Sequence, residues 1–182
     1  IYLPTTKKTM ISKFNSAAAS LMIIVMVFTA SAVDVRAQNL QAQLSNGNIA
    51  YQKGDFEGCR NIYEHVTKSF GARAPMLYGP KFGVIYYRKG LCELKLAGEA
   101  KRGNRQADAS KWFEEAAKSF EVCYTKFPNG GANMAPTINT VHKSCLQRWA
   151  ETKMGLKDYD EALRLYNKFE AERDKVKDKR LP

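Results

Sequence analysis

The sequence predicts an all-α fold, and three observations support this class. Apolar residues recur at the three- and four-residue spacing of an amphipathic helix, and no segment shows the alternation of a half-buried strand. Ala, Leu, Lys and Glu, which favour helices, are frequent. Glycine, proline and capping residues divide the chain after residue 37 into about six helical segments. Of the 182 residues, 45% are hydrophobic and 26% are charged, values that are typical of a globular chain and not of a disordered one.

The N-terminal segment predicts a secretory signal peptide. Met10 is the first methionine, and residues 1–9 are expected to precede the start of translation. Basic residues are followed by an uncharged run, residues 17–33, and small residues then lead to a peptidase site after Ala37. We expect cleavage there and export to the periplasm or cell envelope. The alternative is a membrane anchor formed by an uncleaved N-terminal helix, although the run is shorter than the ~20 apolar residues that span a bilayer.

The first two helices are expected over residues 40–53 and 56–70. Gly54 interrupts the helical pattern, and Asp55 can accept a hydrogen bond from the first free amides of the second helix. A loop follows, over residues 71–80. These segments predict an antiparallel helical hairpin.

The third and fourth helices are separated by a polar and basic stretch. The third helix is expected over residues 81–97, and residues 98–106 predict a loop or a frayed extension of the helix. Asp108 or Ser110 is expected to cap the fourth helix, which ends near residue 127.

The last two helices are expected from Pro136 to about Gly155 and, after a cap at Asp158, to about residue 177. Proline fits the first turn of a helix because its missing N–H has no partner there. The segments between residues 38 and 182 thus form one helical domain.

One short pattern recurs in the second helix of each pair. An aromatic residue is followed after three positions by a small residue and, four positions later, by a second aromatic: Phe56, Cys59 and Tyr63; Phe113, Ala116 and Phe120; Tyr159, Ala162 and Tyr166. A small residue also occurs in each preceding helix, at Gly47, Gly90 and Ala150. This pattern resembles the tetratricopeptide repeat (TPR) family, and the chain is similar to exported bacterial TPR proteins of the cell envelope.

The resemblance implies a short right-handed α-solenoid of about three hairpins, over residues 40–73, 80–128 and 136–178. The first aromatic of each copy would pack at the turn, the small residues would let the helices approach, and the second aromatic would fill the groove towards the neighbouring hairpin. The middle copy carries an insertion of about ten residues between its helices.

The resemblance also implies a non-catalytic scaffold that binds a peptide or a partner helix on the surface of the solenoid. The first helices of the hairpins would build the concave face. Eight residues are candidates to line it: Tyr51, Lys53, Tyr86, Lys89, Glu93, Gln147, Arg148 and Glu151.

The charge of the chain leaves a second function open. The formal net charge is +11, and removal of residues 1–37, which hold four basic residues and one acid, leaves +8. Basic residues gather over residues 88–111 and 173–180. An alternative is therefore a basic helical protein that binds an anionic surface, either membrane head groups or nucleic acid. Nucleic acid is the less favoured of the two, because an exported protein meets lipid first.

The sequence holds no motif of an enzyme, a cofactor site or a metal site. A Walker-type phosphate loop, His-Glu-x-x-His and Gly-x-Ser-x-Gly are all absent. His142 lies three residues before Cys145, but a catalytic dyad would also need a cleft and an orienting group, so a structural role is favoured.

The four cysteines allow two interpretations. Their long spacings disfavour zinc binding. They either replace alanine as small buried residues or form bridges between successive helices, Cys59 with Cys92 and Cys123 with Cys145.

Overall fold

The structure is a computed structural model that describes residues 40–71, 73, 76, 79–127 and 136–178. The chain divides into two compact units, Ile1–Ala42 and Gln43–Pro182. The expected signal peptide, residues 1–37, lies outside the described residues. None of the helices within the described ranges is long and apolar enough to cross a membrane.

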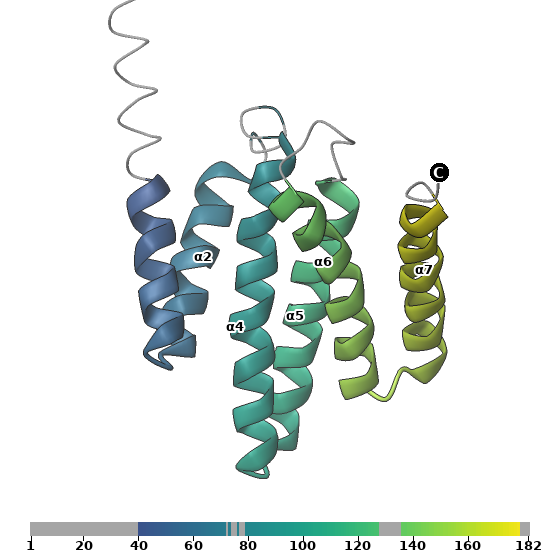
Figure 1. The fold of residues 1–182 in the computed structure, drawn as a ribbon. Coiled ribbons are helices and arrows are strands. Elements are labelled where there is room, and N and C mark those ends of the chain that lie inside the picture. The colour runs from purple at the N-terminus through teal and green to yellow at the C-terminus, as the bar shows by residue number, and fades with distance from the viewer. Residues whose placement is uncertain (1–39, 72, 74–75, 77–78, 128–135, 179–182) are drawn as a thin grey trace, which may run out of the picture. The chain divides into compact units, whose positions relative to one another are not determined.

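The elements of the described chain are helices, which confirms the all-α class. A helix over residues 40–52 is followed by α2 (Phe56–Phe70), the 3-10 helix η1 (Gly79–Phe82), α4 (Gly83–Arg102), α5 (Gln106–Lys126), α6 (Pro136–Gly155) and α7 (Tyr159–Asp178). Each helix from α2 onward packs against the next along the chain, and α4 also contacts α6. The described helices therefore form three hairpins stacked in chain order, an arrangement that fits an α-solenoid in general (Figure 1).

One type of turn closes all three hairpins. In each, a backbone N–H donates to the carbonyl oxygen five residues earlier, over 2.9–3.0 Å. The residue before this N–H takes a positive φ, which ends the first helix. These residues are Gly54, Asn104 and Lys157, with φ of 79°, 55° and 62°. The recurring turn gives a fixed reference point from which the hairpins can be compared.

Residues 98–106 are expected to form a loop or a frayed extension of the helix, and the structure shows that most of this stretch extends the helix. α4 continues to Arg102 and α5 begins at Gln106, so the turn consists of residues 103–105. The added segments pack against each other through small side chains, because Ala97, Ala100 and Ala109 are almost fully buried. The inserted residues are therefore helical rather than irregular.

The insertion lengthens both helices by the same amount. A Cβ atom at Gly47 would lie 2.6 Å from a ring atom of Tyr63, and one at Gly90 would lie 2.8 Å from the ring of Phe120. Both glycines thus allow the close helix contact expected for them. Gly47 precedes the turn residue Gly54 by seven positions, whereas Gly90 precedes Asn104 by fourteen. Seven extra residues add about 10 Å to each helix.

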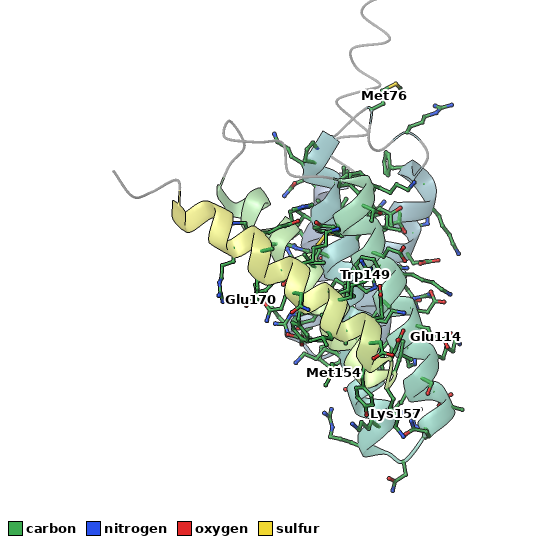
Figure 2. The ribbon with its side chains drawn as sticks, turned by 90° about the vertical axis from the view of Figure 1, so that its right-hand side faces the viewer. Met76, Glu114, Trp149, Met154, Lys157 and Glu170 are labelled. Atoms are coloured by element: carbon green, nitrogen blue, oxygen red, sulfur yellow. A yellow bond between two sulfur atoms is a disulfide. The ribbon has the colours of Figure 1, made fainter. Side chains whose placement is uncertain are left out.

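This extension carries the α4–α5 turn past its neighbours. Figure 1 shows the lower end of α4 and α5 reaching beyond the ends of α2 and α6. In Figure 2 the same turn reaches beyond Lys157, which marks the turn of the third hairpin.

The first aromatic of each copy behaves differently in the three hairpins. Phe56 packs edge-to-face on Tyr51 at the first turn, with ring centroids 5.4 Å apart. Phe113 lies two helical turns from its own tip and contacts Gly155 of the next hairpin instead. Tyr159 is 58% exposed, so the expectation of packing at the turn is wrong for this residue.

Two disulfides join consecutive hairpins. Cys59 of α2 is bonded to Cys92 of α4, and Cys123 of α5 to Cys145 of α6, each with a Cα–Cα distance of 6.2 Å. All four sulfur-bearing residues are buried. The bridge interpretation of the cysteines is confirmed, and both pairs are the ones that the sequence suggested.

An apolar cluster lies where α5, α6 and α7 meet. Its buried members are Ala116, Ala117, Phe120, Leu146, Trp149, Ala150 and Leu165. This cluster holds the second and third hairpins together. The first two hairpins are joined by the Cys59–Cys92 disulfide, by a ring contact between Phe70 and Phe82, and by a buried group of charged side chains.

Candidate interaction surface

A shallow hollow opens between the helix over residues 40–52 and α4. It has a volume of about 170 Å³ and is lined by Asn48, Tyr51, Tyr63, Arg88 and Leu91. Tyr63 forms its floor, because this residue is fully buried, whereas Tyr51, Arg88 and Leu91 are partly exposed at its rim. The hollow thus combines a cation, an amide, an aromatic ring and an aliphatic chain.

Hydrogen bonds hold the polar groups of this hollow in place. The Arg88 guanidinium donates to Asn48 Oδ1. The Tyr63 hydroxyl donates to the same oxygen over 3.0 Å. Burial raises the pKa of Tyr63, although Arg88 opposes the shift, so its hydroxyl remains a donor at neutral pH. Asn48 accepts both bonds and thereby fixes the position of Arg88.

Among the described residues Arg88 has no acidic partner, because it takes part in none of the ion pairs formed there. A guanidinium carries five N–H donors in a planar fork that matches a carboxylate, and one bond to an amide leaves several of them available. The site can therefore bind an anionic group beside an apolar one.

A second polar group lies on α6. Arg148 donates to Glu151 over 2.5 Å, and Gln147 donates to the other oxygen of this carboxylate over 3.1 Å. The bond to Glu151 raises the pKa of Arg148, and a further bond to Tyr87 of α4 acts in the same direction. Here the charges are balanced within the protein, in contrast to Arg88.

These two groups are connected through α4, because Tyr87 contacts Arg148, Leu91 lines the hollow, and residues four positions apart lie on the same side of a helix. We call the surface that they form the three-helix face. It consists of Asn48, Tyr51, Tyr87, Arg88, Leu91, Gln147, Arg148 and Glu151.

Four of the eight residues expected on the binding surface lie on this face: Tyr51, Gln147, Arg148 and Glu151. Lys53 is exposed at the first turn. Tyr86 points elsewhere and stacks on Phe127, with ring centroids 5.5 Å apart.

Lys89 and Glu93 require a correction, because they lie inside the protein. Lys89 is 8% exposed and Glu93 is 0% exposed. The Lys89 ammonium lies 2.9 Å from Glu64 of α2 and 3.1 Å from Glu93. Ser119 of α5 donates to Glu93 over 2.7 Å. The two residues therefore belong to a buried cluster that joins the first hairpin to the second.

The electrostatics of this buried cluster follow from its packing. Burial alone lowers the pKa of Lys89, but the two carboxylates outweigh it and raise the value. Burial raises the pKa of Glu93 despite Lys89 and Ser119. For Glu64, burial is outweighed by hydrogen bonds from Lys89 and Lys68, which lower its pKa to about 2. Arg60 adds a second cation, with Nε 3.8 Å from Glu93.

The sequence pattern of α4 explains why Arg88 was not among the expected surface residues. α4 contacts α2, α5 and α6, so polar and apolar residues occur on several sides of it and its sequence shows no single apolar stripe. Each of the expected residues Tyr86 and Lys89 is adjacent in sequence to a residue of the face, Tyr87 or Arg88, and one position turns a side chain by about 100° around the helix axis. Gly90 is the signal that could have shown which residues of α4 face solvent, because its contact with Phe120 marks the side of the helix that faces α5.

The His142–Cys145 pair is not a catalytic dyad. Cys145 forms a disulfide and has no free thiol. His142 stacks on Tyr124, with ring centroids 4.6 Å apart, and burial lowers its pKa. In the part of the chain that the structure describes, no three His, Cys, Asp or Glu side chains come together as metal ligands.

No family model, curated protein or solved structure matches this chain.

Proposed function

We propose that the protein is a non-catalytic interaction scaffold that binds a segment of a partner protein on the three-helix face. The observation that carries this proposal is the Arg88 guanidinium, which is held by Asn48 and has no acidic partner among the described residues. A peptide with a carboxylate next to an apolar side chain fits, because Tyr51 and Leu91 offer apolar surface beside the cation.

The same proposal includes a TPR-like solenoid. Its support is the recurrence of one turn geometry in three hairpins and the close contacts of Gly47 with Tyr63 and of Gly90 with Phe120. Stacked hairpins place their first helices side by side, so residues from three separate segments can contact one extended ligand.

We further propose that the protein acts outside the cytoplasm, in the periplasm or cell envelope, after cleavage of residues 1–37. Two buried disulfides support this location, since such bonds persist in oxidising compartments. The apolar run over residues 17–33 supports it independently.

Peptide selection tests the proposal directly. Peptides would be selected from a random library displayed on phage, with the oxidised protein as the target, and their Kd measured by calorimetry. Arg88→Gln is expected to weaken binding by 10- to 100-fold, because a hydrogen bond to a charged group contributes about 1.5–3 kcal/mol. The matched control Arg102→Gln removes an exposed arginine from the tip of α4 and leaves the Kd unchanged. Equal affinities for both variants would place the ligand elsewhere and refute the proposal.

A further inference from the structure

The α4–α5 tip, defined as residues 95–111, differs from the rest of the molecule in charge. It carries five basic residues and two acids, which gives a net charge of +3: Lys95, Lys101, Arg102, Arg105 and Lys111 against Glu99 and Asp108. All residues from 101 to 107 are exposed. Arg105 pairs with Asp108 over 3.3 Å, but both side chains are at least half exposed, so water screens this pair.

The other two turns carry no net charge over matching spans. Residues 45–61 hold two basic residues and two acids, and residues 148–164 hold four of each. The difference is clearest at the position before the second helix, where Asp55 and Asp158 stand in the outer hairpins and Arg105 in the middle one. Among these three turns, the one that projects is thus the one with a net positive charge.

The projection lets the tip meet a flat surface on its own. The two extra helical turns set the acids of the neighbouring turns, such as Asp55 and Asp158, back by about 10 Å, which exceeds the Debye length of about 8 Å at physiological ionic strength. Repulsion between those acids and an anionic plane is therefore largely screened. Figures 1 and 2 both show the α4–α5 turn beyond its neighbours.

We propose that the α4–α5 tip docks on an anionic phospholipid bilayer. A bilayer presents many phosphate groups in one plane to a convex tip, and each lysine or arginine near such a surface raises binding about fivefold. Single-stranded nucleic acid is disfavoured because residues 95–111 contain no aromatic side chain on which a base could stack. This site is separate from the three-helix face and does not depend on the function proposed for it.

Vesicle binding tests this inference. The full chain would be sedimented with vesicles of phosphatidylcholine, either alone or with 30% phosphatidylglycerol. The neutral vesicles report apolar binding through residues 1–37, and the basic residues of that segment are unchanged in the tip variant, so the difference between the original and the tip variant isolates the tip. We expect binding to the anionic vesicles to be at least tenfold stronger at low salt and to fall at 0.3 M NaCl. The variant Lys101→Gln/Arg102→Gln/Arg105→Gln should bind about 100-fold more weakly, as three such contributions multiply.

A matched variant separates the tip from the overall charge. Lys53→Gln/Lys126→Gln/Lys157→Gln removes the same charge from other exposed positions and should keep binding within threefold of the original. Equal losses in both variants would show that only net charge matters and overturn the proposal. A 20-base-pair DNA duplex that binds more tightly than the vesicles, and loses binding in the tip variant, would also overturn it in favour of nucleic acid.

Discussion

Replacing Lys89 with methionine tests the buried cluster between the first two hairpins. Methionine keeps the length of the side chain but removes the ammonium that lies 3.1 Å from Glu93 and 2.9 Å from Glu64. At an effective dielectric constant of 20, the attraction over 3.1 Å is about 5 kcal/mol. Because Glu93 is fully buried, loss of Lys89 leaves a carboxylate that water does not reach and that keeps only the Ser119 hydroxyl and the more distant Arg60 as partners. We expect Lys89→Met to lower the free energy of unfolding by about 3–5 kcal/mol at pH 7.

Urea unfolding followed by circular dichroism measures this loss. The control Lys68→Met removes an exposed partner of Glu64 and should cost less than about 1 kcal/mol. In the double variant Lys89→Met/Glu93→Gln both buried charges are absent, so most of the stability should return.

The pH dependence of the same variant follows from Glu93. The pKa of this carboxyl is raised in the folded protein, and loss of Lys89 raises it further, so the folded state takes up a proton before the unfolded state does. The loss in the free energy of unfolding caused by Lys89→Met should therefore become smaller as the pH falls from 7 toward 5. A loss below about 1 kcal/mol that does not vary with pH would contradict a buried ion pair at this position.

Three further predictions concern packing, the disulfides and acid stability. Gly90→Ala should destabilise the protein by about 1–3 kcal/mol, because the added Cβ would press into the ring of Phe120. Gly98→Ala should stabilise it by up to about 1 kcal/mol, because only the flexible side chain of Arg102 lies nearby. Thermal unfolding compares the two variants. Cys59→Ala/Cys92→Ala removes a disulfide between residues 33 positions apart and should lower the free energy of unfolding in urea by about 3.7 kcal/mol. A decrease under 1 kcal/mol would refute this prediction. Since the pKa of Glu64 is lowered from 4.5 to about 2, stability should be lost as the pH falls through this window, and Glu64→Gln should flatten the stability–pH curve there.

The sequence was sufficient to predict most helix boundaries. Gly54 and Asp158 mark turns whose chemistry is local, since a glycine tolerates positive φ and an aspartate can accept from free amides. The structure has helices ending and starting within a few residues of the expected positions around both turns. Local turn chemistry thus locates hairpins well.

The middle hairpin and the phase of α4 depend on contacts that the local sequence does not contain. Glycines and several charges between residues 98 and 106 are typical of a loop, but buried Ala97 and Ala109 pair the two helices along the added turns. Lys89 is polar yet buried, because Glu64 from another hairpin neutralises it. A buried charge whose partner lies in another hairpin can be recognised only once the packing of the hairpins is known.

Binding of a partner segment on the three-helix face is tested by an NMR titration of the ¹⁵N-labelled protein with a peptide selected against it. We expect the side-chain N–H signals of Asn48, Arg88 and Gln147 to shift at a common Kd. In Arg88→Gln the Asn48 and Gln147 signals should shift with a Kd that is 10- to 100-fold weaker. Shifts confined to α2, α5 and α7, or an unchanged Kd in Arg88→Gln, would show that the peptide binds elsewhere.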